Sequence, residues 1–210
     1  MCDKNITVNL KNNYSFWENK DTTKDEKEII NYLKNNLQII RNKKILHIGI
    51  GNSELGLTFC KESAYIDGLT ISVLEKNKGL NYNCYRNIHI CNKYNLNDIN
   101  KFLTDHYDII IDQGIKCYTC CQNHFDDLFD FYIKKINKKG LLISSIYGMN
   151  WSGYDISTKI KNNQFKKKKH KDKTNFDKKG IFTDNELYEK INRYNLSPEK
   201  HNNVLLLKIN

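Results

Sequence analysis

The chain has 210 residues, which is enough for one α/β domain with a sizeable core and short for two. No stretch approaches the roughly 20 apolar residues that a membrane span needs. The N-terminus lacks the apolar run of a signal peptide, so we expect a cytoplasmic protein with no membrane partner. The seven cysteines are an odd number in a chain too large for a disulfide scaffold, and we expect mostly reduced thiols.

The net charge of +10 is concentrated in one segment. Ten lysines and two aspartates lie between residues 159 and 179, so the remainder of the chain is close to neutral. We interpret residues 159–180 as a lysine-rich insertion, either a solvated loop or a binding segment for RNA or an acidic partner. Binding of the second kind would weaken steeply with salt. The segment has few aromatic residues for base stacking, so a platform for single-stranded nucleic acid is weakly indicated.

Residues 1–22 form a polar N-terminal segment with an aromatic cluster that includes Tyr14 and Trp17. This cluster could form a lid over a ligand pocket, or it could pack on the edge of a sheet. From residue 23 to residue 210 we expect one domain. Thr23 and Glu26 have the spacing of a capping box, and the apolar residues that follow predict a helix over 25–40.

Strands and helices alternate along the rest of the chain. The apolar runs predict strands at 45–48, 66–72, 87–91, 107–112 and 141–146. A short helix is expected after the first strand, and an amphipathic helix over 125–136 is expected to end at Gly140. A second capping box, Thr183 to Glu186, begins a further helix, and residues 195–209 read as a hairpin with an antiparallel last strand. The order predicts a mostly parallel seven-stranded sheet with helices on both faces.

A glycine turn follows the first strand, where open α/β sheets bind ligands. Gly49 and Gly51 let the backbone approach a ligand closely, although a plain turn could contain the same residues. A dinucleotide fingerprint needs a third glycine where this chain has Glu54. A carboxylate opposes a pyrophosphate at a helix N-terminus but tolerates the cationic amino group of S-adenosylmethionine (SAM). SAM is therefore the favoured cofactor.

The motifs also carry a family resemblance. Residues 45–55 resemble the first motif of class I methyltransferases, and their Gly-x-Gly-Asn-Ser-x-Leu form is similar to that of the elongation-factor lysine methyltransferase group. Residues 108–114 and 143–148 resemble the fourth-strand and fifth-strand motifs of that group. The resemblance covers nearly the whole chain. It implies a Rossmann-like class I methyltransferase fold, SAM as cofactor and an acceptor that the motifs do not identify.

The chain departs from the family pattern at two positions. Most class I enzymes have an acid where His47 stands and another where Thr70 stands. The stretch Gly-Leu-Thr-Ile-Ser followed by Glu75 resembles cyclopropane fatty-acid synthases, which implies that Thr70 and Glu75 lie on the ribose side. A solvated helix position is the alternative for Glu75. With the residues after the third strand placed near the adenine, the expected cofactor-binding residues are His47, Gly49, Ile50, Gly51, Asn52, Thr70, Glu75, Asn92, Lys93 and Asp112.

Asp112 ends the fourth strand and is the candidate catalytic residue. A carboxylate there could orient or deprotonate an acceptor amine, whereas capping of the following turn is the structural alternative. Tyr147, together with Tyr14 and Trp17, is expected on the acceptor side. The Asn/Asp-Pro-Pro-aromatic motif of base amino methylation is missing, which counts against that activity.

Two classes of function remain. The first is an enzyme that methylates a protein lysine or a small-molecule amine, with RNA as a weaker candidate acceptor. The second is a SAM-fold binding protein without methyl transfer, which the missing acids at positions 47 and 70 motivate. Cys117, Cys120 and Cys121 have no second cysteine pair to complete a four-ligand zinc site, so no metal is expected.

Overall fold

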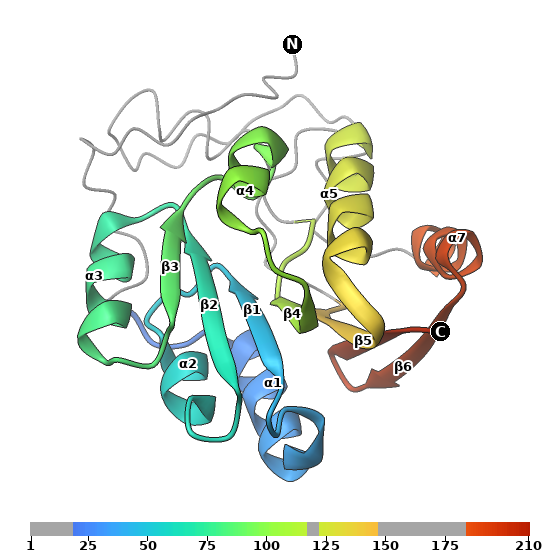
Figure 1. The fold of residues 1–210 in the computed structure, drawn as a ribbon. Helices are drawn as coiled ribbons and strands as arrows, with labels where there is room; N and C mark the ends of the chain where they lie inside the picture. Colours follow the sequence, from blue (N-terminus) through green and yellow to red (C-terminus); the bar gives the residue numbers. More distant parts are fainter. Residues whose placement is uncertain (1–18, 117–121, 147–183) are drawn as a thin grey trace, which may run out of the picture.

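A seven-stranded sheet forms the centre of the computed structural model, which describes residues 19–116, 122–146 and 184–210 (Figure 1). The strand order is β3-β2-β1-β4-β5-β7-β6. The strands are β1 (Lys44–Ile48), β2 (Tyr65–Thr70), β3 (Asn87–Ile90), β4 (Tyr107–Asp112), β5 (Ile136–Ser145), β6 (Leu196–His201) and β7 (Val204–Ile209). The helices are α1 (Lys24–Asn35), η1 (Leu37–Ile39), α2 (Glu54–Phe59), α3 (Val73–Asn81), α4 (Leu96–Phe102), α5 (Gln122–Lys135) and α7 (Asp184–Tyr194).

The pairing of the strands confirms the predicted fold class. β1 to β5 are parallel, and β7 is antiparallel to both of its neighbours, β5 and β6. Residues 196–209 form the predicted hairpin. The strand order reverses between β1 and β4. β2 and β3 lie on one side of β1, and all later strands lie on the other side. This is the Rossmann-like architecture of class I methyltransferases, with helices on both faces.

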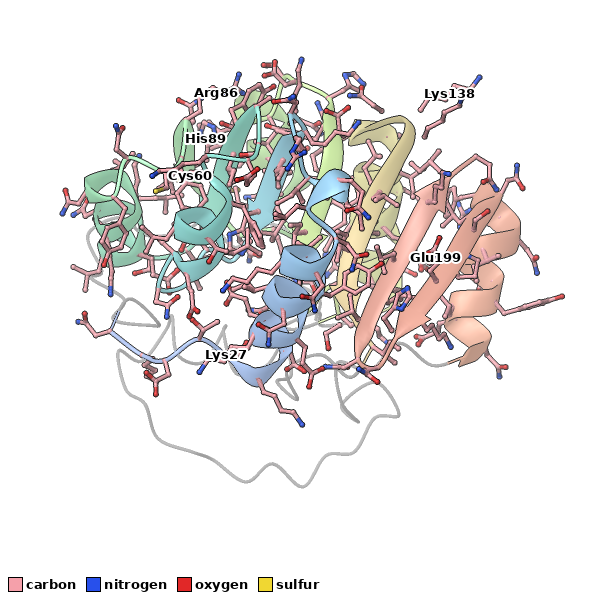
Figure 2. The ribbon with its side chains drawn as sticks, turned by 90° about the horizontal axis from the view of Figure 1, so that it is seen from below. Lys27, Cys60, Arg86, His89, Lys138 and Glu199 are labelled. Carbon is pink, nitrogen blue, oxygen red and sulfur yellow. The ribbon has the colours of Figure 1, made fainter. Side chains whose placement is uncertain are left out.

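The two faces of the sheet carry two separate apolar clusters. One includes residues of α1 and α2, and the other includes residues of α4, α5 and α7. Figure 2 shows Lys27 of α1 and Arg86 on opposite sides of the sheet. Along β1, Ile45 packs toward α1 and Leu46 packs toward α5. Because side chains alternate along a strand, His47 points to the α1 side.

Several predicted boundaries differ from the structure by a few residues, and two of these differences concern the ends of helices. The helix expected over 25–40 ends at Asn35 and continues as the 3-10 turn η1. Gly140 does not end a helix, because β5 already begins at Ile136 and Gly140 lies within it. The β4–β5 register shifts beside this glycine, and a Cβ atom there would lie 2.6 Å from the carbonyl oxygen of Asp108. The glycine is therefore needed for close approach of two backbones at an irregular strand pair.

None of the helices in the described ranges combines the length and the apolar character that crossing a membrane requires. The helix predicted from the second capping box is present as α7, while Thr183 of that box lies outside the described residues. α3 and α4 fill the crossovers on either side of β3, where the sequence patterns were weak.

Candidate functional site

A pocket opens at the carboxyl ends of the central strands, beside the turn that follows β1. It contains about 870 Å³ of space, part of which is open to solvent. The ends of β1, β2 and β4, the residues after β3, the start of α1 and the first turn of α3 contribute to its wall. The predicted cofactor residues that line it are Gly49, Gly51, Asn52, Thr70, Glu75, Asn92, Lys93 and Asp112.

Two glycines shape the rim of this pocket. Gly49 has φ +76° and Gly51 has φ +51°, in the left-handed region that other residues rarely adopt. The Gly49 amide donates to the carbonyl oxygen of Leu69 at 2.7 Å, which fixes the turn against β2. A Cβ atom at Gly49 would meet nothing within 4 Å, so the space beside it is open. The turn thus has the backbone conformation and the free volume that the ligand hypothesis requires.

Two of the predicted cofactor residues do not line the pocket. His47 is buried on the α1 side of β1, where Nδ1 lies 2.9 Å from the hydroxyl oxygen of Tyr85. Its Nε2 lies 3.7 Å from Oε1 of Glu26. Ile50 is fully buried in the apolar cluster on the α1 face of the sheet, beside Gly68 and Gly79. Both side chains are buried beneath the pocket and do not form its surface.

Asn52 connects the glycine turn to the residues that precede α1. Its Nδ2 donates to the carbonyl oxygen of Lys20 at 3.0 Å and to Oγ1 of Thr22 at 2.8 Å. Its Oδ1 accepts the amide of Glu54 at 3.1 Å, and the hydroxyl of Thr22 contacts the Glu54 carboxylate. The residues before α1, including Thr22, consequently form one side of the pocket. The sequence offered no periodic or motif signal for that role.

Thr70 and Glu75 form a buried pair at the end of β2. The Thr70 hydroxyl donates to Oε2 of Glu75 at 2.5 Å and accepts the amide of Ser72 at 3.0 Å. Ser72 caps α3 by accepting the amide of Glu75 at 3.3 Å. Glu75 is only 3% exposed and lines the pocket, so the solvated alternative for this residue is wrong.

Asp112 lies in the pocket wall with both carboxylate oxygens occupied. Lys93 Nζ lies 2.9 Å from Oδ2 and 3.2 Å from Oδ1. The hydroxyl of Tyr132 donates to Oδ2 at 2.8 Å, and the amide of Gly114 donates to Oδ1 at 3.1 Å. Lys93 also donates to the carbonyl oxygen of Gly114 at 2.6 Å. Asp112 therefore caps the turn after β4 and holds Lys93. Capping of this turn is the structural role that the sequence left open as the alternative to catalysis.

Glu26 is the pocket residue whose role sequence reasoning missed. Its amide donates to Oγ1 of Thr23 at 3.2 Å, as the capping box predicts. Glu26 lines the pocket and is 3% exposed. Burial, followed by the charges of Glu54 and Glu75, raises the pKa of Glu26 to about 8. One signal could have found it, since Glu26 shares the buried face of α1 with Ile29, Ile30 and Leu33.

Several predicted features fall outside the described residues. They are Tyr14, Trp17 and Tyr147, the lysine-rich insertion at 159–180, and the cysteines Cys117, Cys120 and Cys121.

Comparison with known proteins identifies the fold. No protein-family model matches the sequence, and no curated protein matches it. Among solved structures, the chain is similar to the N-methyltransferase NodS from Bradyrhizobium japonicum WM9 in complex with S-adenosyl-L-homocysteine (SAH), with a TM-score of 0.58 and 9% identity over 90% of this chain and 88% of that one. It is also similar to magnesium protoporphyrin IX methyltransferase from Synechocystis PCC 6803 with bound SAH, with a TM-score of 0.57 and 10% identity over 88% and 81% of the two chains.

A third similar structure is an rRNA methylase from Streptococcus thermophilus, with a TM-score of 0.51 and 8% identity over 90% of this chain and 98% of that one. Two of these names state different acceptors, magnesium protoporphyrin IX and rRNA, and the NodS name states only that it is an N-methyltransferase. At such low identity the likeness establishes the class I methyltransferase fold, and the chemistry of this chain must be argued from its own pocket.

Proposed function

We propose that the chain is a SAM-dependent methyltransferase whose acceptor is an amine, either a protein lysine or a small molecule. The observation that carries the proposal is a set of three glutamates, Glu26, Glu54 and Glu75, whose charges interact beside the glycine turn. Glu26 and Glu75 line the pocket, and Glu54 begins α2 directly after the turn. Because Glu26 shares the site with two further carboxyl groups, a cationic ligand, which lets Glu26 ionise, is favoured over a phosphorylated one.

SAM fits this chemistry. It carries an ammonium and a sulfonium group and has no phosphate, whereas a dinucleotide would bring its diphosphate toward the glycine turn and the glutamates around it. The open space at Gly49 allows a ligand to contact the backbone, and the buried Thr70–Glu75 pair lies on the side where we expect the ribose. The three methyltransferases of similar fold support the proposal, and two of them were crystallised with SAH.

The groups of this chain would act mainly by positioning. The glycine turn, Thr70 and Glu75 would hold the cofactor, which when bound supplies a methyl group bonded to a positively charged sulfur. Holding donor and acceptor at attack distance can supply roughly 7–11 kcal/mol of the barrier. Asp112 fixes Lys93 and the turn after β4, and this orients the acceptor side of the pocket without a proton transfer at the Asp112 carboxylate.

Transfer of tritium-labelled methyl groups from SAM tests the proposal. The purified chain is incubated with a cell extract, and the label is then measured in the protein, RNA and small-molecule fractions. We expect incorporation into protein or small molecules and none with a Gly49→Val variant, in which a branched side chain occupies the open space at the turn. Label in RNA would instead assign the acceptor to RNA, and no incorporation in any fraction would contradict the enzyme.

A second candidate is a binding protein that keeps the fold without methyl transfer. The observation that favours it is the full occupation of the Asp112 oxygens, which leaves this carboxylate poorly suited to act as a base. Calorimetry separates the two candidates. Binding of SAM and SAH without any transfer of label supports the binding protein, whereas transfer excludes it.

A further inference from the structure

We propose that Glu26 binds the ammonium group of SAM, so that α1 supplies the carboxylate that this chain lacks at position 47. The inference rests on the proposed function and assigns a residue to its cofactor site. Nothing in the sequence motifs places a cofactor ligand on the first helix, and the argument comes from the environment of the Glu26 side chain.

The first step is the position of Glu26. The capping interaction with Thr23 fixes the start of α1, and Thr23 in turn donates to Oε1 of Gln113 at 2.9 Å, beyond the end of β4. Glu26 then continues the apolar stripe of Ile29 and Leu33, which packs on the sheet. Glu26 is one helical turn before Ile29 and therefore lies at the N-terminal end of this apolar contact. At this position Glu26 is on the buried face of α1 and also lines the pocket.

The second step is the lack of a partner. Oε1 of Glu26 is buried and has no hydrogen-bond partner among the residues that the structure describes. The Nε2 atom of His47, at 3.7 Å, is too distant for a hydrogen bond. An unpaired buried carboxyl group is costly in free energy, and such groups in folded proteins are normally paired with a cation or a donor. An ammonium group in the pocket would satisfy it.

The third step concerns His47. Burial lowers the pKa of His47 to about 3, so the imidazole is uncharged at neutral pH and does not neutralise Glu26. When the Tyr85 hydroxyl donates to Nδ1, the proton of the neutral ring is on Nε2, the atom that faces Glu26. An acid at position 47 would instead place a second carboxylate on the same buried side of β1 as Glu26, which disfavours ionisation of both. The site therefore favours one acid, either Glu26 on α1 or an acid at position 47 on β1, over both together.

The fourth step concerns the titratable groups that surround Glu26. His47 faces it from β1, Glu54 from α2, Glu75 from α3, and Tyr85 from the loop before β3. Burial, followed by the charges of the two nearby glutamates, raises the pKa of Glu26 to about 8, and with no cation among these neighbours the group is protonated at pH 7. Binding of an ammonium group would ionise it and release its proton to the solvent.

Calorimetry with two related ligands tests this assignment on the full chain. SAH has the ammonium group, whereas 5′-methylthioadenosine has the same nucleoside thioether without it. For Glu26→Gln we expect the affinity for SAH to fall about 10- to 100-fold, the range for losing a charge-assisted hydrogen bond. The affinity for methylthioadenosine should not change. Titrations in buffers of different ionisation heat should show proton release on SAH binding at pH 7 in the parent and none in the variant.

Glu28→Gln is the matched control, since Glu28 lies on the same helix, is 29% exposed and is not among the pocket residues. It should bind both ligands as the parent does. An equal loss of both ligands in Glu26→Gln would indicate a collapsed pocket and overturn the assignment, as would unchanged SAH binding. A parent that binds neither ligand contradicts the proposed function itself, which is a different result from a parent that binds both.

Discussion

Two buried carboxylates on opposite faces of the sheet have contrasting surroundings. Asp67, in the middle of β2, accepts hydrogen bonds from Arg86 Nε at 3.0 Å and Nη2 at 2.5 Å, and from the Tyr107 hydroxyl at 2.9 Å. The same guanidinium contacts Asp105 at 2.7 Å. Glu26, on the other face, is buried to a similar degree and has an oxygen with no partner in the described part of the chain.

The contrast distinguishes a carboxylate with a structural role, Asp67, from a carboxyl group that we propose to bind a ligand, Glu26. Every strong donor that Asp67 needs is supplied by the chain itself, so this cluster stabilises the β2–β3 pair and requires no ligand. Glu26 lacks such donors, although it lies in a pocket that a ligand can enter. A buried carboxyl group left without a partner is costly for folding, and this cost supports the proposal that the pocket binds a cation.

The largest expected effect is on the paired cluster. Arg86→Met removes the cation and leaves Asp67, whose side chain is 2% exposed, without its main partner. We expect the free energy of unfolding to fall by about 3–5 kcal/mol, as for other broken buried pairs. Urea denaturation monitored by circular dichroism measures it. Arg86, labelled in Figure 2, has a side chain 40% exposed, and Arg86→Lys should restore part of the loss. A loss below about 1 kcal/mol in Arg86→Met would contradict a structural role.

The next effect is the pH dependence that Glu26 imposes. The pKa of Glu26 is about 8 in the folded chain and 4.5 as a reference, so the folded state binds this proton more tightly. Stability should therefore decrease as the pH rises from about 4.5 to about 8. Glu26→Gln removes this loss, and between pH 5 and pH 9 it should gain roughly 2–4 kcal/mol relative to the parent.

Urea midpoints of parent and variant across that range measure the difference. Glu28→Gln serves as the control and should follow the parent. If the urea midpoints of Glu26→Gln and the parent changed with pH in the same way, the Glu26 carboxyl group would already be paired. That result would contradict the contrast with Asp67.

A smaller effect is expected at the glycine turn. Gly49→Ala places a side chain at φ +76°, which should cost about 1–2 kcal/mol of stability through the backbone alone, because the Cβ atom has open space. Ser53→Gly makes the opposite change at φ +71° and should stabilise by about 0.5–1 kcal/mol. Thermal unfolding compares the two variants. Equal shifts in the same direction would exclude the backbone explanation.

The smallest effect is expected at the start of α1. Thr23→Ala loses the cap on the Glu26 amide and the hydrogen bond to Gln113, for about 1 kcal/mol. Lys24→Ala, one residue along and exposed, should change stability by less than about 0.5 kcal/mol. Chemical denaturation of both variants tests the difference. A Thr23→Ala variant as stable as Lys24→Ala would show that the cap does not anchor this side of the pocket.

The sheet could be predicted because buried parallel strands are nearly continuous apolar runs. The run that ends at Ile48, followed by two glycines, located both β1 and the turn at the pocket. The strand ends then placed Thr70 and Asp112 at the same edge, where the structure has them. Positions in a parallel sheet follow from the strand order, so these parts of the site needed no side-chain information.

The pairing of side chains could not be predicted in the same way. Glu26 already satisfied a local pattern, the capping box, and only the packing of α1 against β1 brings it to His47. The Asp67–Arg86 pair depends on the β2–β3 register, which no local signal sets. The prediction that His47 binds the cofactor did not anticipate α1, because its neighbour Glu26 is 21 residues away in the sequence.

The central claim is that the pocket selects a nucleoside that carries an ammonium group and rejects a diphosphate. Its most direct test is a calorimetric titration of one protein sample with SAM, SAH and NAD at a single ionic strength. The account predicts one-to-one binding of SAM and SAH and no detectable heat with NAD. Saturable binding of NAD, or no binding of either sulfur nucleoside, would contradict it.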